Sequence, residues 1–154
     1  MKEIWSILFV LGSLFNAAVA QESKKESPQE RRERLRIAVQ AICPVTGEKL
    51  GAHGKPIKMT DSDTKEVLYL CCEACLKSKV GAKHLATIRT RLAQAQGTCL
   101  VMSDNDISAE SKHSVVEGQL VFVCCPPCIK KMAAEPEKFL SMLDDRYEAF
   151  LNKK

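Results

Sequence analysis

The sequence predicts an α+β fold built of two tandem units, each a β-hairpin followed by a helix, with further helices before, between and after them. Three observations lead to this prediction. A lone Cys, a β-like run and then Cys-Cys-x-x-Cys occur twice in the 154-residue chain. In each copy two short apolar runs precede the cysteine cluster, as in a hairpin. Segments with apolar residues at helical spacing flank both copies. The chain therefore contains an internal duplication.

Residues 1–20 are predicted to be a signal peptide. Lys2 supplies a positive start, an apolar run extends from Ile4 to Phe15, and Ala18-Val19-Ala20 forms a small-x-small cleavage site. The run is too short for a comfortable membrane span. We expect a periplasmic or secreted protein, with membrane contact only if the signal segment stays uncleaved.

Residues 21–41 are expected to be a polar segment followed by a capped helix. Ser27 suits the N-cap, Pro28 the first helical position, and Glu30 the reciprocal position of a capping box. The apolar residues at helical spacing after this start are Leu35, Ala38, Val39 and Ile42.

The first unit spans residues 42–89. Residues 43–56 are rich in Gly and Pro and are predicted to form a loop. Ile57–Thr60 and Glu66–Leu70 are predicted to pair as strands, and Cys71–Lys79 to begin a helix. A second helical stretch carries an apolar face at Leu85, Ile88 and Leu92.

Residues 90–97 form a helical linker in this prediction, and residues 98–152 form the second unit with a long C-terminal helix. The turn Glu117-Gly118 separates its two strands. The expected elements of this unit, in chain order, are strands Ser114–Val116 and Gln119–Val123, a short helix Cys124–Ala134, and an amphipathic helix from Pro136.

All eight cysteines belong to the repeated pattern, and we expect them to be metal ligands: Cys43, Cys71, Cys72 and Cys75, then Cys99, Cys124, Cys125 and Cys128. Two cysteines four residues apart share one face of a helical turn, and the lone loop cysteine can fold back over them. The positive end of the helix favours thiolates. Three converging thiolates suit Zn²⁺ or a softer ion such as Cu⁺.

The fourth ligand stays open at this point. The candidates are Cys72 and His53 in the first unit, and Cys125 and Met102 in the second. Cys72 follows Cys71 directly, so on a helix it would point about 100° away. Met102 has the C-x-x-M spacing that a thioether-seeking ion favours, but it would also suit packing against the hairpin. The remaining histidines, His84 and His113, are interpreted as surface residues.

The stretch CPVTGEKLG…GKPIKM…VLYLCCEACLKS resembles the TRASH and YHS group of small metal-binding modules, especially exported versions with a CPVTG loop and a CCxxC helix. The resemblance covers residues 42–89 well and residues 98–143 more loosely, because CLVMSDND replaces CPVTGEKL in the second copy. It implies treble-clef-like fingers that bind heavy-metal ions. The residues on the family positions are Cys43, Cys71 and Cys75, and Cys99, Cys124 and Cys128.

Two other functions remain open. An exported chain with an even number of cysteines also suits a disulfide-stapled structural or interaction domain, although the vicinal pairs are awkward partners for ordinary bridges. The C-x-x-C pairs Cys72–Cys75 and Cys125–Cys128 suit thiol–disulfide exchange, but no βαβ framework surrounds them. Loss of Cys43 or Cys99 would destroy a metal site and spare such a redox pair.

The composition limits the classes of partner that we expect the protein to bind. The net charge of +4 arises from basic and acidic residues that alternate, as in ERRERLR, which predicts a solvated surface and no nucleic-acid partner. No constellation of a hydrolase or other enzyme is visible, so we expect no catalysis. The expected partners are a metal ion and a metal-handling or efflux protein.

Overall fold

A computed structural model describes residues 26–153, so the predicted signal peptide and most of the polar segment lie outside the described residues. The fold class is α+β, as predicted. The described elements, in chain order, are α1 (Pro28–Gln40), β1 (Ile57–Thr60), β2 (Val67–Leu70), the 3₁₀ helix η1 (Glu73–Lys77), α2 (Ala82–Gln96), β3 (Lys112–Val116), β4 (Gln119–Val123), α3 (Pro126–Ala134) and α4 (Pro136–Asn152).

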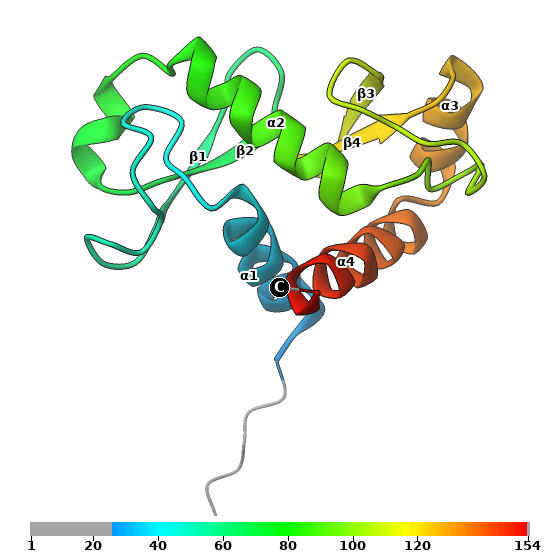
Figure 1. Cartoon of the computed structure of the whole chain (residues 1–154), viewed down its shortest axis with the longest axis horizontal. Helices are drawn as coiled ribbons and strands as arrows, with labels where there is room; N and C mark the ends of the chain where they lie inside the picture. The colour runs from blue at the N-terminus through cyan, green and yellow to red at the C-terminus, as the bar shows by residue number, and fades with distance from the viewer. Residues whose placement is uncertain (1–25, 154) are drawn as a thin grey trace, which may run out of the picture.

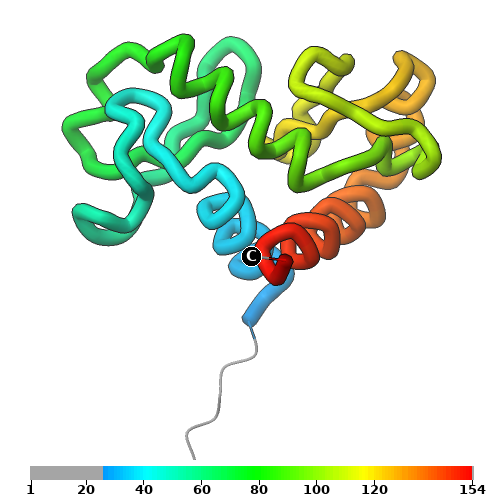
Figure 2. The backbone as a smooth tube through the Cα atoms, in the orientation of Figure 1, coloured from blue at the N-terminus to red at the C-terminus, as the bar shows by residue number. Residues whose placement is uncertain are grey.

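Three helices hold the two hairpin units together. Helix α2 runs between the units, while α1 and α4 converge on one side of it (Figure 1). Each of these three helices contacts the other two. The chain path in Figure 2 shows that α2 leaves the first hairpin unit and leads directly into the second. One helix therefore serves both copies of the repeat.

The start of α1 has the predicted capping box. The Glu30 N–H donates to Ser27 Oγ at 3.2 Å, and the Ser27 N–H donates to the Glu30 carboxylate at 2.8 Å. Pro28 occupies the first turn, where its missing N–H has no helical partner to lose. Leu35 and Val39 are buried against the other helices.

The four strands form two separate antiparallel hairpins, β1–β2 and β3–β4. The hairpins meet where the Val67 N–H donates to the Gly118 carbonyl at 2.8 Å. Gly118 has a φ of +80°, and a Cβ there would lie 2.5 Å from a Val67 methyl carbon. Only glycine fits this turn without strain.

A buried glutamine, not predicted from the sequence, fixes each hairpin to the end of the preceding helix. Gln40 donates to the Tyr69 carbonyl at 2.6 Å and accepts from the Tyr69 N–H at 3.0 Å. Gln96 makes the same pair of bonds with Phe122, at 2.7 Å and 3.0 Å. Each glutamine stands three residues before a lone cysteine. The structural repeat therefore begins within the helix that precedes the cysteine.

The buried apolar residues form two unequal clusters. The larger joins α1, α2 and α4 to the second unit, and includes Cys99 and Cys128. The smaller cluster lies within the first unit and consists of Cys43, Leu50, Val67, Tyr69, Leu70, Cys71 and Cys75. The first unit thus has the smaller apolar core, in which four buried side chains accompany the three cluster cysteines.

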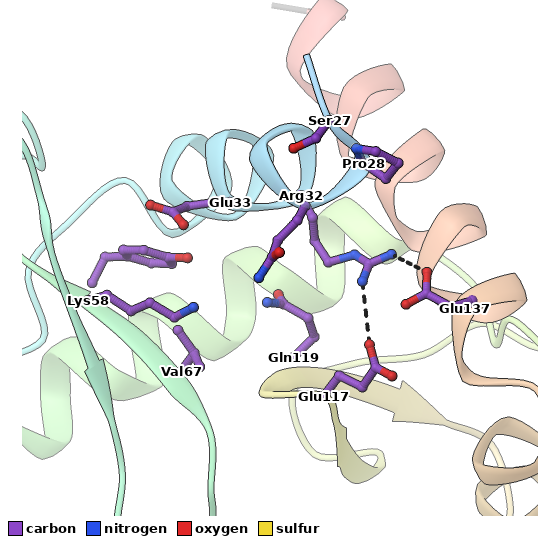
Figure 3. A pocket seen from close by; sticks show the side chains of 11 residues that line it. Ser27, Pro28, Arg32, Glu33, Lys58, Val67, Glu117, Gln119 and Glu137 are labelled. Carbon is purple, nitrogen blue, oxygen red and sulfur yellow. Dashed lines mark hydrogen bonds and ion pairs between the residues drawn. The ribbon is translucent and has the colours of Figure 1, made fainter. Parts of the chain in front are cut away.

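Charged side chains fill the junction between the units and the helices. Arg32 of α1 lies 3.6 Å from Glu117 and 3.1 Å from Glu137 (Figure 3). It also lies 3.3 Å from Asp144. The cavity beside it, of about 470 Å³, is lined by no cysteine. Among the described residues this charge cluster connects α1, the second hairpin and α4, and it lies apart from the cysteine sites.

Candidate metal centre

The first site brings together three cysteines, which we call the first cluster: Cys43, Cys71 and Cys75. Their sulfur atoms all lie within 4.8 Å of one another, with Cys75 Sγ 3.9 Å from Cys43 Sγ and 3.7 Å from Cys71 Sγ. Four sulfurs held tetrahedrally at about 2.3 Å from one zinc ion would be about 3.8 Å apart. All three side chains are buried. The spacing fits a shared metal ion.

The second site repeats this arrangement in Cys99, Cys124 and Cys128, the second cluster, whose sulfurs also lie within 4.8 Å of one another. Cys124 Sγ and Cys128 Sγ are 3.8 Å apart. Cys99 and Cys128 are buried, whereas Cys124 is partly exposed. The second cluster is therefore more accessible than the first.

The helix geometry expected around the clusters was wrong in one respect. Cys71 and Cys75 do not share the first turn of a helix, because the 3₁₀ helix η1 begins only at Glu73 and Cys72 keeps an extended backbone, with φ −161° and ψ 167°. In the second unit the helix likewise begins at Pro126, after an extended Cys125. The second strand of each hairpin ends directly before the vicinal cysteines, at Leu70 or Val123, and the two cysteines lead from the strand end to the helix start at each site.

The extra cysteines lie beside the clusters but outside the mutually close sets. Cys72 Sγ is 3.6 Å from Cys75 Sγ and 3.9 Å from Cys71 Sγ. Cys125 Sγ is 3.2 Å from Cys128 Sγ and 3.8 Å from Cys124 Sγ. Each extra thiol therefore contacts two of the three sulfurs in its cluster.

Backbone groups wrap the lone cysteine of each site. The Cys43 N–H donates to the Glu48 carbonyl at 2.8 Å, and the Gly47 N–H donates to the Cys43 carbonyl at 2.9 Å. Gly47 has a φ of +77°, which glycine adopts without strain. In the second unit the Cys99 N–H donates to the Asn105 carbonyl at 2.9 Å. Both loops turn the cysteine sulfur towards the strand and helix.

These loops also determine the electrostatics of the lone thiols. Burial opposes ionisation of Cys43, but N–H groups of Thr46, Cys71 and Val45 point at its sulfur, and together they lower its pKa to about 7. The pKa of Cys99 is lowered in the same way: burial opposes the shift, and backbone N–H groups that include Met102 outweigh it.

The cysteines within the helices, Cys75 and Cys128, have raised pKa values. Burial, reinforced by the neighbouring thiols, raises the pKa of Cys75 to about 12 and also raises the pKa of Cys128. Each cluster therefore combines a lone thiol whose pKa is lowered with a helix thiol whose pKa is raised, and a positive charge nearby would favour ionisation of the helix thiol. A bound cation supplies that charge and releases the protons.

The rim of the first cluster carries oxygen and nitrogen donors. Thr46 Oγ1 is 3.6 Å from Cys71 Sγ, and a Glu48 carboxylate oxygen is 3.8 Å from the same sulfur. His53 Nε2 lies 3.3 Å from that Glu48 oxygen. Of these residues only His53 was predicted from the sequence, because Thr46 and Glu48 belong to no cysteine or histidine motif.

His84 is not the surface residue expected from the sequence. It is partly buried beneath the first loop, where a Cβ at Gly47 would lie 2.7 Å from its Nε2. The absent side chains of Gly47 and Gly81 make room for this ring. His84 packs under the loop and is not a member of the first cluster.

The rim of the second cluster carries a thioether. Met102 Sδ is 3.8 Å from Cys124 Sγ, and the Met102 side chain is 49% exposed. Packing against the hairpin, the other interpretation of this residue, therefore accounts for only half of its surface.

Comparisons of the chain with protein-family models, with curated proteins and with solved structures found no significant match. Among residues 26–153, no helix has the length and apolar character needed to cross a membrane.

Proposed function

We propose that this is an exported protein that binds soft or transition-metal ions, Zn²⁺ or Cu⁺, through the cysteine thiolates of two repeated fingers. Its role would be sequestration, transfer to a metal-handling partner, or structural stabilisation, without catalysis. One observation carries the proposal: three sulfurs converge in each unit within 4.8 Å, from a loop, a strand end and a helix. The resemblance to the TRASH and YHS modules and the predicted signal peptide are consistent with it.

The lone cysteine and the two cysteines four residues apart are the ligands in each finger. Cys72 and Cys125 would then act as fourth ligands or as exchange thiols through which an ion enters and leaves, because each contacts two cluster sulfurs. Thiolates favour Zn²⁺ and Cu⁺ over hard ions such as Mg²⁺. The two roles of the extra thiol differ in what its loss would do to release rate and affinity.

Thiol–disulfide exchange is the second candidate, and one distance favours it: Cys125 Sγ and Cys128 Sγ, at 3.2 Å, form the shortest of the sulfur–sulfur contacts given above. An exchange reaction needs only this C-x-x-C pair, whereas a metal site also needs the lone cysteine. The two functions therefore assign opposite importance to Cys99.

Single Cys→Ser variants separate the two functions. Under metal binding, Cys43→Ser and Cys99→Ser should each abolish tight binding of one metal ion, Zn²⁺ or Cu⁺, so that the total stoichiometry falls from two ions to one. Under exchange chemistry, Cys99→Ser should keep disulfide-reducing activity, and Cys125→Ser should lose the part of that activity that the Cys125–Cys128 pair supplies. A Cys99→Ser variant that still binds two ions with unchanged affinity would contradict the proposed function.

A further inference from the structure

The two metal sites differ at one equivalent loop position. Thr46 stands three residues after Cys43, and Met102 stands three residues after Cys99. Each contributes a backbone N–H to the sulfur of its lone cysteine. Each side chain then reaches the cysteine that follows the second strand, Cys71 or Cys124. Thr46 and Met102 are therefore structural counterparts that cover the same corner of the site.

The chemistry at this corner is opposite in the two sites. In the first, Thr46 Oγ1 lies 3.6 Å from Cys71 Sγ and the Glu48 carboxylate lies 3.8 Å from it. In the second, Met102 Sδ lies 3.8 Å from Cys124 Sγ. None of the contacts of residues 26–153 joins a carboxylate to a sulfur of the second cluster. The donor atoms beside Cys71 are therefore hard oxygens, whereas the donor atom beside Cys124 is a soft sulfur.

The distance between the Met102 and Cys124 sulfurs fits a metal ion bound by both. The distance from Met102 Sδ to Cys124 Sγ equals that from Cys124 Sγ to Cys128 Sγ, 3.8 Å in both cases. This is also about the sulfur–sulfur edge of a tetrahedral site. A thioether is a poor ligand for Zn²⁺ but a good one for Cu⁺.

The exposure of Met102 points in the same direction. Among the described residues, the large hydrophobic side chains that are exposed are Leu76 and Met102. A methionine half in water contributes less to the core than a buried one. Its position over Cys124, itself partly exposed, places a soft donor at the entrance to the second cluster.

We propose that the second cluster is a Cu⁺ site completed by the Met102 thioether, whereas the first cluster, with Thr46 and Glu48 at its rim, binds Zn²⁺. This inference rests on the proposed function and assigns a different ion to each of its two sites. Thr46 and Met102 are the residues that determine the difference. The protein would hold a Zn²⁺ ion for structure in its first unit and exchange Cu⁺ through its second.

A reciprocal swap tests the proposal. The reduced protein and its Met102→Thr and Thr46→Met variants are titrated anaerobically with Cu⁺ and with Zn²⁺, in competition with chelators of known affinity. We expect Met102→Thr to weaken Cu⁺ binding at one site at least about tenfold and to leave Zn²⁺ binding unchanged. Thr46→Met should strengthen Cu⁺ binding at the other site. Because Met102 is half exposed, its replacement should leave the unfolding temperature unchanged, which thermal unfolding checks.

A direct readout of coordination comes from the methionine methyl groups. With ¹³C-methyl methionine, Cu⁺ should shift the Met102 methyl resonance while that of Met142, on α4, stays in place; Zn²⁺ should shift neither. X-ray absorption of the copper form should then count four sulfur ligands, and three after Met102→Thr. An unmoved Met102 methyl, or unchanged Cu⁺ affinity in Met102→Thr, would overturn this inference while metal binding itself stood. Failure of both ions to bind at either site would overturn the proposed function as well.

Discussion

The two units arrange three equivalent sulfurs in the same way, but the apolar cores around those sulfurs differ in size. The first cluster lies in a small core of its own, in which three of seven buried residues are the cluster cysteines. The second cluster shares the larger core with α1, α2 and α4. A small apolar core supplies little stability by itself, so that such a unit also needs disulfides or a bound metal ion. The first unit should therefore depend on its metal for folding, and the second should not.

The largest expected effect comes from metal removal. In the reduced protein freed of metal, amide hydrogens of the first hairpin, β1 and β2, should exchange at least about a hundredfold faster than in the metal-bound form. Those of β4 should change much less, because β4 packs into the larger core. Hydrogen exchange with mass spectrometry measures both hairpins in one sample. Equal loss of protection in both hairpins would remove the distinction between the units.

The next effect concerns a buried ion pair that the first unit has and the second lacks. Arg36 and Glu66 lie 2.9 Å apart with both side chains buried. The equivalent positions of the second unit hold Leu92 and Gln119. Glu66→Gln should lower the free energy of unfolding by about 3 kcal/mol, because it leaves the Arg36 charge buried without its partner.

The double variant Arg36→Leu, Glu66→Gln copies the second unit and sharpens this test. It should be more stable than Glu66→Gln alone, since no uncompensated charge remains. Urea unfolding of the two single variants and the double variant gives the coupling energy. Simple additivity would show that the pair does not act as a unit.

A smaller effect should be equal in the two units, because the glutamine bonds are repeated. Gln40→Ala and Gln96→Ala each leave a buried N–H and a buried carbonyl of the hairpin without partners, so each should cost about 2 kcal/mol. Gln94→Ala, at an exposed position of α2, is the matched control and should be neutral. If either buried variant were as stable as this control, the bonds would not support the hairpin.

The smallest effect lies at the helix ends. Ala41 and Gly97 occupy equivalent positions, with φ of 62° and 76°, where an alanine is strained and a glycine is not. Ala41→Gly should stabilise the protein by about 1 kcal/mol, and Gly97→Ala should destabilise it by about the same amount. No atom lies within 4 Å of a Cβ built at Gly97, so this cost belongs to the backbone. Thermal unfolding of both variants checks the opposite signs.

Much of the fold and part of the site could be predicted from the sequence, for identifiable reasons. Short apolar runs separated by polar turns predicted both hairpins, and the Ser27 capping box predicted the start of α1. Cysteine spacing identified the six residues that converge. The extended backbone at Cys72 and Cys125 was not predicted, because the sequence pattern shows that a helix follows the strand but not at which residue the helix begins.

Residues without a motif were also missed. Gln40 and Gln96 act through hydrogen bonds to strands far along the chain, and a single glutamine carries no periodic signal. Aligning the two copies from the lone cysteines backwards would have found them, since both stand at the same distance from that cysteine. The same alignment forwards pairs Thr46 with Met102, so the duplication itself contains the information that composition and spacing do not.

Metal binding in this protein requires that the cysteines hold the ions as thiolates. The most direct measurement is the metal content of the protein purified without chelator, combined with a count of free thiols in denaturant after the metal is removed. We expect one or two ions of zinc or copper per chain and eight free thiols. A metal-free protein without free thiols, its cysteines joined in four disulfides, would contradict it.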